Sequence, residues 1–221
     1  MPVHRIYSHY WHRYWNQNRD HLVQPTQHLT KRIMKKYLAL ILMVILSSNM
    51  VQAQQSVEVD VEKSNVEWLA KKVGGQHDGL VSIQKANIIF NSQGEVSQAN
   101  IVMDMTSITV EDLSGGAKNS LTNHLKDPDF FNTEDYPEAS FTVKEGNGKS
   151  GEVLGILTIK DISKEYALQY EYKDGEIKGK LVIDRTDFDI MYKSKSILDA
   201  KAVADGFIYD EFTITFTLVS K

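Results

Sequence analysis

Phe-Thr-Ile-Thr-Phe-Thr-Leu, residues 212–218, alternates large apolar side chains with threonines. Successive side chains of an extended strand point to opposite faces, so the apolar residues share one face and the threonines share the other. Aromatic and β-branched residues also favour strands. The stretch therefore predicts a half-buried β-strand with one face against a core.

The same alternation recurs along most of the chain. It is found in residues 64–72, 80–90, 99–105, 139–143, 153–159, 166–172 and 177–183. The 80–90 run changes phase near Ala86 and Asn87, which predicts a bulge or bend. Gly, Asn and Asp mark the turns between runs, as in Lys173-Asp174-Gly175. These features predict an all-β fold, either an antiparallel sandwich or a barrel.

Residues 114–136 interrupt the alternation. Two leucines four residues apart define one face of a short helix, which Pro128 ends. Two adjacent phenylalanines follow in a segment that otherwise reads as loop. Contiguous exposed apolar surface is unusual in soluble proteins, so we expect this helical insert to cover one end of a barrel. The cover residues are Leu121, Leu125, Phe130 and Phe131.

The first 53 residues differ in character from the rest. Residues 1–33 show no sustained period and are interpreted as an extended or misassigned leader. Residues 34–53 combine a basic start, a ten-residue apolar run and small residues before a cut after Ala53, the pattern of a secretory signal peptide. A membrane span needs about 20 apolar residues, so a run of ten favours cleavage over the alternative, an uncleaved membrane anchor. We therefore predict export to the periplasm or beyond, with residues 54–221 as the mature domain.

The composition of the chain excludes several classes of function. Residues 1–53 hold seven of the 25 basic residues and one of the 29 acidic ones, so residues 54–221 keep 18 basic and 28 acidic residues, a formal net charge of −10. So acidic a surface repels phosphate backbones, which argues against a nucleic-acid partner. The chain has no cysteine, so disulfides and thiolate metal sites are excluded. The 168 mature residues can bury about 70% of their unfolded surface, enough for a stable single domain.

The apolar faces of the predicted strands are rich in aromatic and methionine side chains. A solid core packs large and small residues closely, whereas such a wall also suits a long, adaptable cavity. An alternation with a period of two residues is expected for a filled core and for a cavity wall alike, so both interpretations stay open on the pattern alone. We expect Gly179→Trp to separate them, by filling ligand space or by overpacking. The candidate ligand-binding wall comprises Trp68, Phe90, Ile101, Met103, Met105, Phe141, Leu157, Tyr170, Leu181, Phe212, Ile214 and Phe216, some of which must plug the closed end.

Candidate metal ligands are better explained by local structure. His124, Asp127 and Asp129 are interpreted as cap and turn residues, because hard oxygen ligands would need more partners. His77 lies between glycines and is interpreted as a solvated turn residue. No metal or cofactor is predicted.

Candidate catalytic residues are Asp184, Arg185 and Asp187. Paired carboxylates of glycosidases face each other across a cleft, whereas these lie within four residues at a strand end. Arg–carboxylate contacts are common structural devices, so we predict an ion-pair and turn cluster around Arg185. No catalytic residue is predicted, and the protein is expected not to be an enzyme.

Four motifs, in order along the chain, resemble the YceI-like family. Residues 124–132, followed by residues 136–141, look like its HL…DFF…YP…F signature. Residues 103–108, 155–160 and 184–190 are similar to three further family motifs. The resemblance runs from about residue 57 to residue 219.

The resemblance implies an eight-stranded antiparallel, lipocalin-like β-barrel, exported to the periplasm, that binds a polyisoprenoid or similar amphiphilic lipid in a hydrophobic tunnel. Asp161 and Asp189 stand where the family usually has glycine. We therefore predict non-enzymatic binding, transport or sequestration of a long-chain isoprenoid or other lipid. The alternatives are a secreted stress or structural protein with a filled barrel, and an enzyme of isoprenoid or sugar chemistry. Transient membrane contact and a monomeric or dimeric state are left open.

Overall fold

The computed structural model describes residues 31–37, 55–143, 151–196 and 206–221. The chain divides into two units, Met1–Val51 and Gln52–Lys221. In the first unit residues 31–37 are helical. The remainder of the predicted leader and signal sequence lies outside the described residues. In the ranges that the structure describes, no helix is long and apolar enough to cross a membrane.

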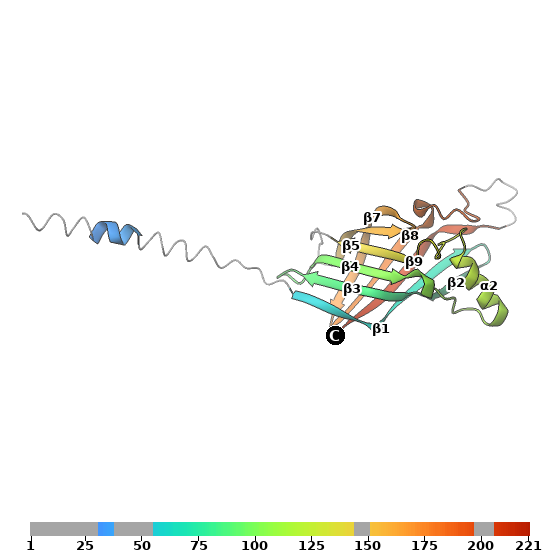
Figure 1. The fold of residues 1–221 in the computed structure, drawn as a ribbon, viewed down its shortest axis with the longest axis horizontal. Coiled ribbons are helices and arrows are strands. Elements are labelled where there is room, and N and C mark those ends of the chain that lie inside the picture. The colour runs from blue at the N-terminus through green and yellow to red at the C-terminus, as the bar shows by residue number, and fades with distance from the viewer. Residues whose placement is uncertain (1–30, 38–54, 144–150, 197–205) are drawn as a thin grey trace, which may run out of the picture. The chain divides into compact units, whose positions relative to one another are not determined.

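The second unit is a β-structure with few helices (Figure 1). Two 3₁₀-helices, η1 and η2, directly follow strands, and α2 lies between β4 and β5. The elements are β1 (Gln55–Lys72), β2 (Gly75–Leu80), β3 (Ser82–Phe90), β4 (Val96–Asp104), η1 (Met105–Ser107), α2 (Gly115–Lys126), β5 (Glu138–Val143), β6 (Glu152–Ile159), β7 (Ile162–Lys173), β8 (Glu176–Asp184), η2 (Arg185–Phe188) and β9 (Ile208–Ser220).

The sheet closes into a barrel of eight antiparallel strands. Each strand from β3 to β9 pairs with the next, and β9 pairs with β1. β2 and β3 both pair with β1, through opposite halves of it, and only Val81 separates them. The Val81 N–H donates to the Val66 carbonyl at 3.0 Å, so β2 and β3 occupy one position in the barrel. The predicted eight-stranded antiparallel barrel with a short helical insert is confirmed.

Two local predictions in this region are wrong. His77 belongs to β2, opposite Ala70, and its Nδ1 lies 2.8 Å from an Asp112 carboxylate oxygen. The glycine-flanked segment looks like a turn in sequence, but backbone pairing to the long β1 strand makes it extended. The bulge predicted near Ala86 and Asn87 is displaced, because the pairing of β3 with β4 shifts register between Ile83 and Lys85 and again between Ile89 and Phe90.

One end of the barrel is plugged by side chains. Phe90 is 2% exposed and its ring stacks on Tyr172 with centroids 4.7 Å apart. The Tyr170 hydroxyl accepts a hydrogen bond from the Val96 N–H at 3.1 Å, in buried surroundings. Phe90 and Tyr170 therefore pack into the interior at this end.

Aromatic rings over glycines fill part of the middle of the barrel. A Cβ built on Gly179 would lie 2.2 Å from the Phe216 ring and 2.6 Å from the Gln169 carbonyl oxygen, and one on Gly155 would lie 2.3 Å from the Phe141 ring. Gly179→Trp would therefore overpack whether or not a cavity exists elsewhere. The expectation that this substitution separates the two cases is wrong, because Phe216 already occupies the space.

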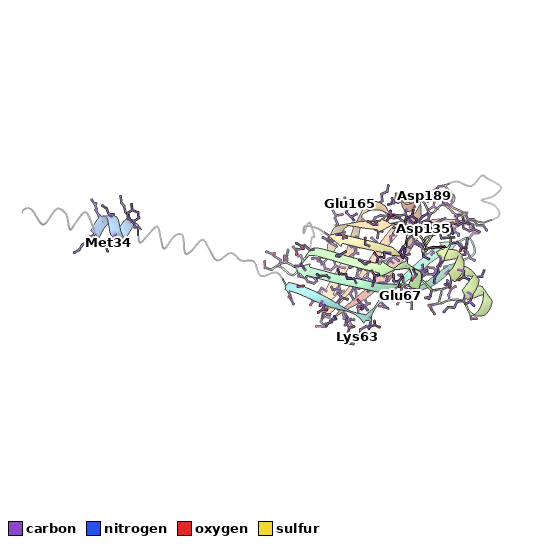
Figure 2. All side chains as sticks on the ribbon, in the orientation of Figure 1. Met34, Lys63, Glu67, Asp135, Glu165 and Asp189 are labelled. Atoms are coloured by element: carbon purple, nitrogen blue, oxygen red, sulfur yellow. The ribbon has the colours of Figure 1, made fainter. Side chains whose placement is uncertain are left out.

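The two aspartates that replace family glycines take the glycine-like conformation. Asp161 and Asp189 have φ of 60° and 56°, in the left-handed region that aspartate tolerates better than most residues. The Lys160 ammonium donates to the Asp189 carbonyl at 3.2 Å. Asp189 and Asp135 both lie towards the α2 end of the barrel (Figure 2). The turns thus keep their geometry without glycine.

Candidate functional site: an apolar cavity under the helical cover

A cavity of about 150 Å³ lies inside the barrel on the side of α2, opposite the plugged end. Each of the eight strand positions of the barrel contributes residues to the cavity wall. At the position that β2 and β3 share, this residue is Val81, which lies between the two strands. Apart from Ser140, Arg185 and Tyr209, the lining residues are apolar. Cavities with walls of this kind stay free of water and accept apolar molecules of about the size of benzene.

Ten of the twelve residues proposed from sequence for the ligand-binding wall line this cavity. The other two, Phe90 and Tyr170, belong to the plugged end. The ten are Trp68, Ile101, Met103, Met105, Phe141, Leu157, Leu181, Phe212, Ile214 and Phe216. Their role in ligand binding stays a prediction.

The cover lies over part of the α2 end of the cavity. Leu125 and Phe130 are buried and, with Phe131, line the cavity, whereas Leu121 packs against the core from outside it. The chain turns sharply after α2 because the Asp127 carbonyl accepts hydrogen bonds from the N–H groups of Phe130 and Asn132, both at 3.0 Å. This turn directs both phenylalanines back towards the barrel.

We expect Phe130→Ala to lower the free energy of unfolding by about 3–5 kcal/mol, because its buried ring contacts His124 and Tyr192 as well as the cavity. Phe131→Ala, at a half-buried ring, should cost less. Urea denaturation measures both variants. If both lose less than about 1 kcal/mol, as surface substitutions do, the cover is a mobile flap rather than a packed element.

His124 joins the cover to the segment after η2. Its ring lies edge-on to Phe130 and Tyr192, with centroids 4.9 and 4.5 Å away. Its Nδ1 is 3.8 Å from an Asp127 carboxylate oxygen, and its buried Nε2 has no hydrogen-bond partner among the described residues. In the described part of the chain, no three His, Asp or Glu residues gather in a way that could hold a metal.

Two aspartates fold the chain over the rim of the barrel in the same way. The Asp104 carboxylate accepts from the Thr106 N–H at 2.9 Å and its hydroxyl at 2.6 Å, capping η1. The Asp184 carboxylate makes the same two bonds with Thr186, at the same distances, and caps η2. The repeated Asp-x-Thr sequence is a signal that could have predicted these caps. The intervening residues, Met105 and Arg185, consequently enter the cavity wall.

The acidic partner of Arg185 differs from the prediction. Within the described residues its guanidinium pairs with Asp210 at 3.4 Å, not with Asp184 or Asp187. It also donates to the carbonyls of Ile190, Ile208 and Tyr209 at 2.8, 3.2 and 3.3 Å.

Neighbouring acids in sequence are engaged elsewhere, since Asp184 caps η2 and Asp187 accepts from the Tyr166 hydroxyl at 2.8 Å. Burial lowers the pKa of Arg185, and Asp210 opposes this shift. Burial and the hydrogen bond to Asp187 both raise the pKa of Tyr166. The guanidinium thus ties η2 to the start of β9 through four hydrogen bonds.

Trp68 is the tryptophan of residues 54–221, since the other two are Trp11 and Trp15. It lines the cavity, and its indole N–H donates to the Thr109 carbonyl at 3.0 Å. This bond fixes the ring on the wall and satisfies its one polar group. The position makes Trp68 a natural fluorescent reporter of the cavity.

These features define a class: closed eight-stranded antiparallel barrels with an apolar interior cavity. A family model, the YceI-like domain, matches residues 57–220. The chain belongs to the YceI-like family. The motifs that resembled this family are therefore correctly assigned.

Among solved structures, BcnA shares this fold. BcnA of Burkholderia cenocepacia is 21% identical with a TM-score of 0.54, and the match covers 74% of this chain and all of BcnA. The YCEI protein of Campylobacter jejuni is 20% identical with a TM-score of 0.44, covering 64% of this chain and 84% of that one. No match was found among curated protein sequences.

Proposed function

We propose that this protein binds a long-chain polyisoprenoid or similar amphiphilic lipid in the barrel cavity and carries or sequesters it without chemical change. The supporting observation is the apolar cavity under the cover, whose one charged lining residue, Arg185, has its guanidinium donors bound to carbonyls and Asp210. Such a wall favours apolar chains at roughly 0.8 kcal/mol for each buried CH₂. A polar headgroup would stay at the rim, near Tyr209.

A lipid tail longer than a benzene-sized group fits into the cavity only if side chains of the cavity wall move. The adaptable side chains are Met103 and Met105, whose unbranched thioethers change rotamer at low cost. The half-buried Phe131 of the cover can also move without opening the plugged end. We propose that the ligand enters at the α2 end and displaces these groups.

Binding can be tested with residues 54–221, which contain the complete barrel. We expect a fluorescent prenyl probe to quench Trp68 emission or accept energy from it, with saturation at one site. Native mass spectrometry of protein from an exporting host should find a co-purifying lipid. A bound metal would favour the enzyme alternative, and a bare mass with no probe uptake would favour the filled barrel.

Export is proposed from the signal-like residues 34–53. We expect N-terminal sequencing of the exported form to begin at Gln54, because the small residues before the cut suit a signal peptidase. An intact segment containing residues 35–46 recovered in the membrane fraction would instead indicate an anchor. The periplasm is the proposed location, where the lipid would otherwise face water.

A further inference from the structure

A basic and apolar surface surrounds one side of the cavity opening. Three chain segments build it: the end of β1 with its following turn, residues 189–196 after η2, and the start of β9. Figure 1 shows β1 ending and β9 beginning at the α2 end of the barrel. We name this surface the mouth patch; it comprises Lys71, Lys72, Val73, Lys193, Lys195, Phe207 and Tyr209.

Specific contacts hold the mouth patch together. The Val73 N–H donates to the Phe207 carbonyl at 3.0 Å, and the Ile208 N–H donates to the Lys193 carbonyl at 3.0 Å. The Phe207 and Tyr209 rings meet edge-on with centroids 5.1 Å apart, and the Lys195 ammonium lies 5.6 Å from the Phe207 ring. The patch is therefore one continuous surface from three segments.

In the described residues of these three segments, four lysines stand against three acids, Asp189, Asp210 and Glu211. Residues 54–221 carry a net charge of −10, yet four lysines gather here. Among the described residues, none of these lysines forms an ion pair. The nearest acids of β9 are Asp210, which binds Arg185 and Ser196, and Glu211, which is exposed.

Exposed apolar side chains accompany the lysines and lead into the cavity. Val73 and Tyr209 are 51% and 49% exposed. Tyr209 also lines the cavity, as does its neighbour Ile208. A half-exposed residue that belongs to the cavity wall marks where the apolar interior reaches the surface.

We propose that the mouth patch docks the barrel on an anionic lipid bilayer, with the cavity opening facing the membrane. Lysines attract anionic headgroups, and tyrosine with aliphatic side chains enters the interfacial layer. The acidic remainder of the domain would be repelled, which orients the molecule. The inference rests on the proposed lipid binding, because it assigns the route by which the ligand enters and leaves.

The test compares two double variants of residues 54–221 with equal charge change. Lys72→Gln with Lys195→Gln removes two patch lysines, and Lys173→Gln with Lys180→Gln removes two exposed lysines near the plugged end and on the outer wall. Flotation with phosphatidylglycerol vesicles measures binding. We expect the patch variant to bind roughly 25-fold more weakly, about fivefold for each lysine, and the control to stay within about threefold of wild type. Val73→Ser should weaken binding further.

Prenyl-probe uptake without vesicles is measured in parallel and should be the same in all variants. The proposal is overturned if wild type does not bind anionic vesicles, if it binds phosphatidylcholine vesicles equally, or if both double variants lose binding equally. A wild type that forms dimers which the patch variant abolishes, with no vesicle binding, would assign the patch to a second copy. Vesicle binding through the patch with no probe uptake would reject the proposed function and leave the docking surface standing.

Discussion

Arg185→Ala is expected to lower the free energy of unfolding by about 3–5 kcal/mol, mainly because it leaves buried carbonyl oxygens without a donor and to a lesser extent because it leaves Asp210 without its cation. Three carbonyls, of Ile190, Ile208 and Tyr209, would lose a donor at the same time. The loss should appear in urea denaturation as a lower midpoint. Probe binding should also weaken, because the start of β9 lines the cavity.

The matched variant is Asp210→Asn. Nη1 of Arg185 lies 2.8 Å from the Ile190 carbonyl, whereas Nη2 lies 3.4 Å from the Asp210 carboxylate, so the contact to the carbonyl is the shorter one. We therefore expect Asp210→Asn to cost less than half as much as Arg185→Ala. If Asp210→Asn costs the larger amount, the ion pair rather than the carbonyl contacts holds this corner of the barrel.

Ala139→Phe is expected to weaken probe binding at least tenfold while changing stability by less than about 1 kcal/mol, because the cavity admits a ring of benzene size. Ala139 is 7% exposed, lies on β5 opposite Met103 and lines the cavity. The added ring would occupy the space of the lipid tail. Trp68 fluorescence measures the binding, and thermal unfolding measures the stability.

Ala99→Phe is the control for this experiment. Ala99 is also 7% exposed, but it lies on β4 between Ile88 and Val143 and is not part of the cavity wall. Its substitution should overpack the plugged end, at about 1–3 kcal/mol, and leave the affinity of the folded protein unchanged. Equal destabilisation by the two variants would mean that the space near Ala139 does not admit a ring. Unchanged probe affinity in Ala139→Phe would place the ligand elsewhere.

Together with the vesicle experiment on the mouth patch, these experiments separate three steps of the proposed lipid carriage. Vesicle binding measures docking, the Phe130 and Phe131 variants measure the cover, and the Ala139 variant measures occupancy of the cavity.

The alternation of apolar and polar side chains determined most of the barrel without tertiary information. Period two directly assigns Met103, Phe141 and Phe216 to the inner face, because adjacent residues of a strand cannot share a face. The apolar residues of the insert predicted a cover, which the structure places on the cavity. Repetition of Asp-x-Thr at the ends of β4 and β8 would also have predicted both caps, since aspartate at this position accepts from the residue two ahead.

Height along the barrel and contacts between distant segments were decided only by the tertiary structure. The alternation places Tyr170, like Phe141, on the inner face of the barrel, yet Tyr170 lies at the plugged end. Strand register, and not the period of the alternation, sets how far along the barrel axis a residue lies. Gly179 looks like free space until cross-strand pairing brings the Phe216 ring over it. Arg185 stands beside two acids in sequence, yet both bind other groups, and its own partners come from residues 190 and 208–210. The local sequence pattern indicates which face of a strand a side chain lies on, whereas these partners come into contact only when the sheet closes into a barrel.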